Sequence, residues 1–481
     1  MKDSLSMNAV STADQMKPTP GWTVAVVACA AQFMVVLDTT IVNVALPSMR
    51  ADLGLTSAGQ QWVINAYLLT FAGFLMLGGR AADLFGRRRV FTAGLVLFTL
   101  AGLLGGLATS GPLLIGARTL QGLGAAFLAP APLALINSYY QDVRIRTRAI
   151  AAWGATATAA GSCGILLGGV LTDGPGWRWV MFVNVPIGVA LVAVALRSLP
   201  VSPGEGRGRP LDVPGAVLVT AALACASYAL SGMEAHSWAS LRTGGVLALA
   251  CVLLIAFVMV EARGAQPLMP LRIFRNRSLV LGNLAALAIG AVTTSVMFFI
   301  TLYLQHVLGY TPMEAGLAML PLTVAIAVAS LLARRLVQAM GPRLPLALGW
   351  LLTAGGLLWQ SRFTADGTFV TDVLGPGILL GLGLGTTVLP MTIAATSGVP
   401  AEDAGLASAM MNTARQMGGG LGLAALNALA GAVMGAAAVT TAVTTRGYAA
   451  ALVGAAGLAL AAGALALFMP KPRPAASAPA A

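Results

Sequence analysis

Charged side chains are few inside the long apolar stretches of this chain, and they are the first place to look for chemistry. Asp38 lies in the first apolar stretch and Arg118 in the fourth. At about 1.5 Å of rise per helical residue, Asp38 lies roughly 12 Å and Arg118 roughly 9 Å from the same side of the bundle. Burial and a nearby arginine act in opposite directions on the proton affinity of a carboxyl group. Such a pair suits reversible binding of a proton or of a cationic molecule.

A structural ion pair that never changes its protonation is the alternative for Asp38 and Arg118, and both alternatives stay open here. Arg415 is the other clear charge inside an apolar stretch. It either attracts an anionic or carbonyl-bearing group or satisfies backbone carbonyls. His236 and His306 have no metal-ligating partner at a suitable spacing, so we expect no metal site.

The composition indicates which solvent surrounds these stretches. The chain has 58% hydrophobic and only 9% charged residues, with a mean hydropathy of +0.85. Soluble domains carry roughly 25% charged residues, so a hydrocarbon environment explains the deficit. Apolar segments of about twenty residues, the length that crosses a bilayer core of about 30 Å, are expected at fourteen places: 22–46, 60–79, 90–109, 112–137, 149–171, 180–199, 213–232, 243–261, 279–304, 315–333, 344–361, 373–396, 405–434 and 448–469.

The net charge of +12 is explained by where the basic residues stand. With the N-terminus inside, most of the 28 Lys and Arg residues fall in inner segments. The outer segments hold only Arg50, Arg178, Arg242, Arg362 and Arg446. This bias is the positive-inside rule. It predicts a multi-pass protein of the cytoplasmic membrane with both termini in the cytoplasm, and it leaves no charge that calls for nucleic acid as a partner.

The polar connections divide the chain into two similar halves. The longest, near 200–214, follows six apolar stretches, and a second inner stretch at 263–277 precedes the last six. We therefore predict a cytoplasmic tail (1–21), a six-helix bundle (22–199), a linker with two inserted helices (200–262), a second six-helix bundle (263–469) and a second tail (470–481). Bundles that rock about a central site are a common plan of transporters.

The loop after the second stretch carries the first family resemblance. Gly79, Asp83, Gly86, Arg87 and Arg88 stand in the sequence Gly-Arg-Ala-Ala-Asp-Leu-Phe-Gly-Arg-Arg-Arg. This pattern resembles the signature loop between the second and third helices of the major facilitator superfamily. The resemblance implies a gating loop that latches the two halves in one state and releases them in the other. The alternative is that the arginines serve membrane topology alone.

Three further stretches are similar to the fourteen-helix drug:proton antiporters of the EmrB/QacA type, actinomycete antibiotic-resistance exporters among them. They are 37–47 in the first helix, 177–188 before the sixth and 402–422 in the thirteenth. Arg118, followed by Gln121 and Gly122, resembles the fourth-helix motif whose arginine is implicated in proton coupling. The resemblance implies an all-α major facilitator fold of fourteen transmembrane helices arranged as six, two and six. It also makes Asp38 the acid that binds the proton or a cationic substrate, and Arg118 the coupling residue.

The fifth helix departs from this family pattern. It keeps the glycines Gly164, Gly168 and Gly169, which let helices approach closely, but it lacks the proline that usually precedes such a pair. That element is associated with antiport, so its loss favours symport slightly. The glycines serve either helix packing alone or a conformational change.

The helices also carry polar and aromatic residues that could line a central cavity. We expect these cavity residues to be Asn43, Trp62, Tyr67, Asn137, Phe298, Tyr303, Asn412 and Arg415. Apolar walls with a few polar groups suit small, hydrophobic, drug-like ligands. For Trp62 and Tyr67 the alternative is a place in the aromatic belt at the membrane interface.

Proton-coupled efflux of a hydrophobic drug or antibiotic by alternating access is the function that these features favour. A symporter or facilitator that imports a small metabolite is the alternative on the same fold. An enzyme would need a cluster of His, Cys or carboxylates at one membrane depth, and the sequence has none. We expect protons and the lipid bilayer as partners, no cofactor beyond the proton gradient, and no obligate protein partner.

Overall fold

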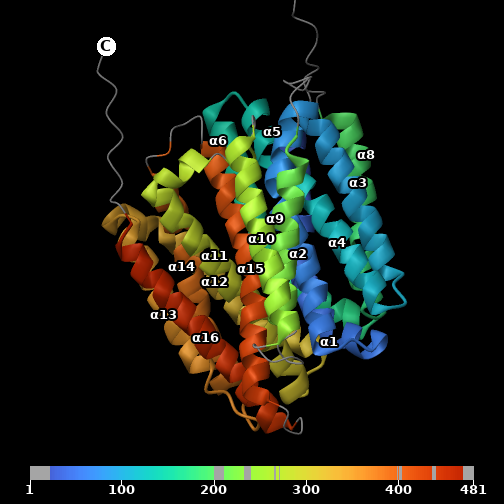
Figure 1. The fold of residues 1–481 in the computed structure, drawn as a ribbon, viewed down its shortest axis with the longest axis vertical. Coiled ribbons are helices and arrows are strands. Elements are labelled where there is room, and N and C mark those ends of the chain that lie inside the picture. Colours follow the sequence, from blue (N-terminus) through green and yellow to red (C-terminus); the bar gives the residue numbers. More distant parts are fainter. Residues whose placement is uncertain are drawn as a thin grey trace, which may run out of the picture.

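The computed structural model of the chain describes residues 22–199, 211–231, 240–264, 267–269, 271–397, 399, 404–435 and 440–469. Within these ranges the chain forms helices and no β-strand, so the all-α prediction is confirmed. Hydrocarbon offers no hydrogen-bond partner, and a helix satisfies its own backbone groups, so apolar stretches of this length fold as helices. The helices lie side by side in one elongated bundle (Figure 1).

The N-terminal bundle is formed by the first eight helices. They are α1 (Thr23–Leu53), α2 (Ser57–Phe85), α3 (Arg87–Gly106), α4 (Gly111–Leu128), α5 (Ala131–Tyr139), α6 (Val143–Asp173), α7 (Arg178–Phe182) and α8 (Asn184–Ser198). The predicted stretch 112–137 is split into α4 and α5, because Pro130 and Pro132 interrupt the helical hydrogen bonds there.

The rest of the chain forms a helical hairpin and a second bundle. The inserted hairpin consists of α9 (Val213–Ser231) and α10 (Leu241–Arg263). A 3-10 turn (Leu271–Arg275) leads into the C-terminal bundle, which also contains π-helical turns at Tyr303–Val307 and Phe369–Leu374. Its helices are α11 (Arg277–Leu302), α12 (Pro312–Met340), α13 (Arg343–Gln360), α14 (Gly375–Thr396), α15 (Ala404–Met434) and α16 (Thr441–Leu467).

The number of membrane spans is close to the predicted fourteen. In the described part of the chain, 13 helical segments are long and apolar enough to cross a membrane. The predicted stretch 344–361 corresponds to α13, which is not among them: it has 18 residues, begins at Arg343 and ends at Gln360. It packs against α14 and α16 within the C-terminal bundle. The count of fourteen therefore depends on this short helix.

The inserted hairpin lies over the seam where the two bundles meet. α9 packs against α2 of the N-terminal bundle and α15 of the C-terminal bundle, and Figure 1 shows α9 and α10 running across this side of the molecule. The Asn65 side chain of α2 donates a hydrogen bond of 2.9 Å to the Ser227 hydroxyl of α9. These contacts fit the predicted division at 22–199, 200–262 and 263–469, which stays a prediction. The tails at 1–21 and 470–481 and most of the linker at 200–210 lie outside the described residues.

We name the two ends of the bundle after the connections they carry: the α1–α2 end (residues 54–56) and the α2–α3 end (residue 86). Hydrogen bonds join the two bundles near the α1–α2 end. The Gln305 side chain donates to the carbonyl oxygen of Val44 at 2.9 Å. The backbone N–H of Met313 donates to Oδ2 of Asp173 at 2.9 Å. The bundles are therefore held together at the α1–α2 end in this conformation.

The glycines singled out in the fifth predicted helix lie on α6 and make two kinds of contact. A Cβ added at Gly164 or Gly168 would lie 3.1 or 3.0 Å from a carbonyl oxygen of α1, so these two pack α6 within its own bundle. A Cβ at Gly169 would lie 2.6 Å from Cα of Met313, on α12 of the other bundle. Gly169 therefore permits the closure of the α1–α2 end.

Gly169→Ala is expected to loosen that closure, because the added methyl group meets rigid backbone of α12. Hydrogen–deuterium exchange of the purified full-length protein would measure it, with faster exchange expected in peptides covering 305–315. Gly161→Ala on the same helix is the matched control, since a Cβ there meets nothing within 4 Å. Equal exchange in the two variants would contradict the assigned role of Gly169.

Candidate functional site

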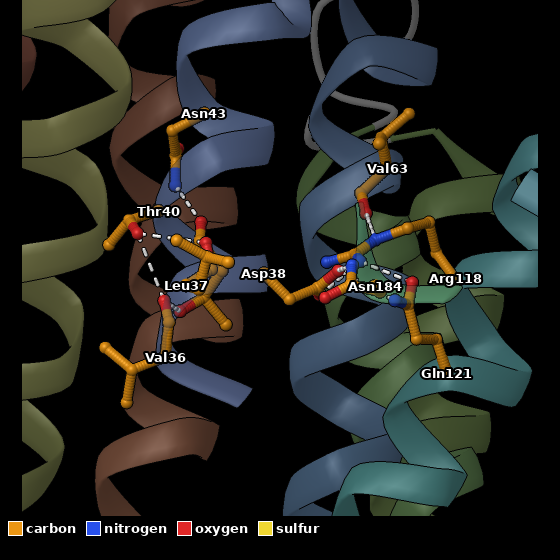
Figure 2. A network of polar contacts seen from close by, with 10 residues as sticks. Val36, Leu37, Asp38, Thr40, Asn43, Val63, Arg118, Gln121 and Asn184 are labelled. Atoms are coloured by element: carbon orange, nitrogen blue, oxygen red, sulfur yellow. Dashed lines mark hydrogen bonds and ion pairs between the residues drawn. The ribbon is translucent and has the colours of Figure 1, made fainter. Parts of the chain in front are cut away.

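Asp38 and Arg118, which lie 80 residues apart in the sequence, form an ion pair inside the N-terminal bundle. An Nη1 proton of Arg118 on α4 is donated to Oδ2 of Asp38 on α1 over 2.6 Å. Asp38 is 0% and Arg118 1% exposed. Figure 2 shows the carboxylate of Asp38 pointing away from α1 toward the guanidinium. The predicted juxtaposition of these two charges is therefore present in the structure.

Neutral side chains complete the environment of this ion pair. Nε2 of Gln121 and Nδ2 of Asn184 both donate to Oδ1 of Asp38, at 2.7 and 2.8 Å. Arg118 donates to Oε1 of Gln121 at 2.7 Å and to the carbonyl oxygen of Val63 at 3.2 Å. A buried charge is tolerated where such hydrogen bonds and an opposite charge surround it. Four helices, α1, α2, α4 and α8, thus converge on this ion pair (Figure 2).

An aromatic ring and a close helix contact hold the guanidinium in place. The Arg118 guanidinium lies 4.4 Å from the centre of the Tyr67 ring, a cation–π contact. Next to Gln121, Gly122 brings α4 against α2, since a Cβ there would lie 2.4 Å from the carbonyl oxygen of Tyr67. Only glycine allows this approach. The Tyr67 hydroxyl is buried and has no hydrogen-bond partner among the described residues.

The opposite side of α1 has a different character. Thr39, Thr40 and Asn43 are partly exposed, and Figure 2 shows Thr40 and Asn43 on the other side of the helix from Asp38. Nδ2 of Asn43 donates to the carbonyl oxygen of Thr39 at 2.7 Å, while its Oδ1 has no donor within the described chain. One helix therefore presents the enclosed acid on one face and a polar, accessible stripe on the other.

Arg415 is accessible although it lies well inside α15. Its side chain is exposed, and it donates to Oδ1 of Asn412 at 2.9 Å. It is close enough to Tyr67 for the two side chains to interact electrostatically. Asn412 and Arg415, both predicted to line the cavity, are therefore bonded to each other, and Arg415 is near Tyr67, which itself contacts Arg118.

Other residues predicted to line the cavity have different surroundings. Tyr67, Phe298 and Tyr303 are buried, at 0%, 2% and 0% exposure, and line no open space. The Tyr303 hydroxyl reaches Oδ2 of Asp372 and the carbonyl oxygen of Thr364, both at 2.9 Å. Tyr303 thus packs against the α13–α14 connection of the C-terminal bundle, and its part in a cavity, like that of Phe298, stays a prediction.

Asn137 lies at an end of the bundle. It is exposed at the end of α5, close to the α2–α3 end rather than at the centre of the bundle. This position agrees with its place at the end of the predicted stretch 112–137. Trp62 lies near the start of α2, at the α1–α2 end, and is partly exposed.

The predicted gating loop is anchored within its own bundle. Arg87 donates to the carbonyl oxygen of Ala134 at 3.2 Å, and Arg88 donates to that of Leu196. Asp83 is half exposed and pairs with Arg87 of the same loop at 3.7 Å. Gly79, which is partly exposed, and Asp83 lie in the last turns of α2, so Gly86 alone separates α2 from α3; its φ of 94° favours glycine. The contacts described for Asp83, Arg87 and Arg88 all lie within the N-terminal bundle.

Sequence reasoning assigned no role in the site to Gln121 and Asn184, although both are fully buried and bind Asp38 directly. Their signal was a side-chain amide inside or next to an apolar stretch. In hydrocarbon an unsatisfied amide is costly as well, so intramembrane Asn and Gln deserve the same scrutiny as charged residues.

Asp38→Asn is expected to lower the stability of the purified protein by about 3–5 kcal/mol, because it leaves the Arg118 charge buried without its partner. Combining it with Arg118→Gln should restore part of the loss, measured by thermal unfolding in detergent. Asp52→Asn is the matched control: its ion pair with Arg178 is 2.7 Å long but its side chain is 44% exposed, so less than about 1 kcal/mol should be lost. Equal losses at Asp38 and Asp52 would contradict the enclosed site.

Solved structures share this fold at low sequence identity. A bacterial homologue of the human lysosomal transporter Spinster, in an inward-facing and occupied conformation, has a TM-score of 0.64 at 16% identity, covering 94% of this chain and 97% of that chain. An autoinhibited peptide transporter of the POT family has a TM-score of 0.65 at 17% identity, covering 95% and 98%. At these identities the likeness shows the fold.

Relatives of known name are much closer in sequence. The cephamycin export protein CmcT of Amycolatopsis lactamdurans is 44% identical over 427 residues, 88% of this chain and 88% of that protein. The puromycin resistance protein pur8 of Streptomyces alboniger is 40% identical over 431 residues, 89% of this chain and 85% of that protein. The family model described as Major Facilitator Superfamily matches residues 28–423, from α1 to α15. This chain is a membrane transporter that belongs to the Major Facilitator Superfamily.

Proposed function

We propose that this chain exports a hydrophobic, drug-sized antibiotic across the cytoplasmic membrane in exchange for protons. The enclosed Asp38–Arg118 pair is the observation that carries the proton coupling, since a buried acid in a transporter is otherwise costly. Export is supported by the names of the relatives, an antibiotic export protein and an antibiotic resistance protein. The missing proline in α6 is the observation that favours import, and it is the weaker of the two.

The direction of access follows from the topology that we propose. The Lys and Arg distribution puts both termini, and therefore the α2–α3 end, in the cytoplasm. Hydrogen bonds join the bundles at the α1–α2 end, while the described contacts of Asp83, Arg87 and Arg88 stay within the N-terminal bundle. We propose that this conformation receives its substrate from the cytoplasm or the inner leaflet. Rocking of the bundles would reverse these contacts and open the other side.

Protonation of Asp38 is the proposed coupling step. A neutral carboxyl group no longer holds the Arg118 guanidinium, which retains the Val63 carbonyl, Gln121 and the Tyr67 ring as partners. Oδ1 of Asn184 has no donor in the described structure, so it can accept a hydrogen bond from the carboxyl proton that Asp38 gains. The converging helices would then settle into a second arrangement. Coupling between the proton site and the drug site requires an element with two arrangements whose equilibrium the proton shifts, and these helices would be that element.

The position of Asp38 on α1 connects this step to the substrate. Asn43 lies on the accessible side of the same helix, so a shift of α1 that follows protonation changes the surface that a drug touches. In the C-terminal bundle, Arg415 has Asn412 as a neutral partner and is itself exposed. We propose that Arg415 attracts a carbonyl-bearing or anionic group of the substrate, while apolar walls bind the rest.

The same proposal covers the remaining properties of the protein. The proton gradient is its energy source, no cofactor or metal takes part, and transport rather than catalysis is its activity. It acts as a multi-pass protein of the cytoplasmic membrane, without an obligate protein partner or nucleic acid.

Cells that lack their own efflux pumps should become more resistant to one or more antibiotics when they express this chain, and should accumulate less of that drug. Puromycin and cephamycin are the first compounds to test, because relatives are named for them. A proton uncoupler should remove the difference from vector-only cells. Higher drug accumulation in the expressing cells would instead indicate import.

Asp38→Asn in proteoliposomes should abolish drug uptake driven by a pH gradient, because the variant has no carboxyl group to carry the proton. Exchange of labelled drug at equal pH on both sides should persist and would show that the variant is folded. Asn184→Ala keeps both charges, so it should transport with an altered pH profile. Asp366→Asn removes an exposed loop acid and serves as the control. Full gradient-driven uptake by Asp38→Asn would rule out its coupling role.

A further inference from the structure

Two acidic residues, Asp212 and Glu261, lie at the α2–α3 end of the inserted hairpin, far from Asp38 along the chain. Asp212 caps the start of α9, where its Oδ1 accepts the backbone N–H of Gly215 at 2.9 Å. Glu261 stands in the last turn of α10 and is only 2% exposed. The start of α9 and the end of α10 meet at this end because the two helices form an antiparallel pair.

The two carboxyl groups form no salt bridge with a basic residue in the described part of the chain. Oε2 of Glu261 accepts the backbone N–H of Met269 at 3.0 Å. The other oxygens, Oε1 of Glu261 and Oδ2 of Asp212, have no donor partner in the described part of the chain. The carboxyl groups of Asp212 and Glu261 are close enough to interact electrostatically. Ionised carboxylates are acceptors only, so these two partnerless oxygens can join in a hydrogen bond only when one of the groups carries a proton.

No described basic residue forms a salt bridge with either carboxyl group, so none neutralises the pair in place of the proton. Asp212 is the titratable group that faces Glu261 from α9, and the 267–269 segment contributes the backbone N–H groups of Leu268 and Met269. Arg263, the next basic residue of α10, is exposed. The salt bridges within the described ranges involve other carboxylates. Two carboxylates that share a site without a cation retain one proton to higher pH than a single exposed carboxylate does.

The residues on either side of the pair contact both bundles. Leu211, next to Asp212, packs on the N-terminal bundle beside the gating loop, against Ala81, Ala82 and Val90. Met269, which donates its N–H to Glu261, packs on the C-terminal bundle, in the cluster of Ile273, Leu279, Ala407 and Met410. The carboxyl pair therefore lies at the point where the inserted hairpin connects one bundle to the other.

We propose that Asp212 and Glu261 form a second proton-binding site, which holds one proton between the two carboxyl groups and thereby fixes the hairpin to both bundles at the α2–α3 end. When the proton leaves to water, both groups become carboxylates and repel each other, and the 267–269 segment is released from Glu261. The site thus makes the connection between the bundles depend on the pH at this end. It does not depend on the direction of transport or on the substrate.

Infrared spectroscopy of the purified full-length protein, titrated between about pH 5 and about pH 9, tests the shared proton directly. A protonated carboxyl band should persist near neutral pH and disappear as the pH rises. Glu261→Gln and Asp212→Asn should each remove it, and either variant suffices if the other does not fold. Glu314→Gln, which removes the acid of an exposed capping box on α12, should leave the band unchanged. Absence of the band in the wild-type protein near pH 7 would overturn the proposal.

Hydrogen–deuterium exchange over the same pH range tests the mechanical consequence. After correction for the intrinsic pH dependence of exchange, peptides covering 264–276 should lose protection as the proton leaves. Glu261→Gln should stay protected at every pH, because its amide group donates to Asp212 without titrating. Glu261→Ala should be unprotected throughout. The same pH response in Glu261→Gln as in the wild-type protein would contradict the lock.

Discussion

A carboxylate and a guanidinium inside hydrocarbon have no water to solvate them, so they must satisfy each other or be satisfied by neighbouring polar groups. In this protein that constraint brings four helices of the N-terminal bundle to one point. Asp38 receives Arg118, Gln121 and Asn184, and Arg118 also uses a backbone carbonyl and an aromatic ring. The packing of the bundle around this point, including the contact at Gly122, follows from the need to keep that set complete.

The same constraint gives the site two distinct states, which differ in the protonation of Asp38. When Asp38 is charged, every group of the network has a partner. When Asp38 is neutral, the Arg118 charge loses its counter-ion, which favours a rearrangement of the helices. Because α1 has Asp38 on one face and Asn43 on the other, the rearrangement reaches the accessible side without a long relay. Interfaces between packed helices tend to switch between arrangements and do not deform gradually, which makes them suitable for this coupling.

Hydropathy and charge in the sequence were sufficient for the class of fold, the position of the spans and the meeting of Asp38 with Arg118. These properties depend on the length of each segment and on the depth of a residue within it, and both follow from the order of residues along the chain. The rotation of each helix about its axis does not follow from that order. This rotation determines that Tyr303 packs in the C-terminal bundle while Asn43 is accessible. The place of Asn137 near the end of a span, by contrast, was visible in the predicted stretch 112–137.

The central claim is that Asp38 exchanges a proton when the transporter binds its drug. It can be measured by adding the exported drug to purified, detergent-solubilised protein in a weakly buffered solution and following the pH. The account predicts that the wild-type protein releases protons on drug binding and that Asp38→Asn, which still binds the drug, releases none. Equal proton release from both proteins would contradict it.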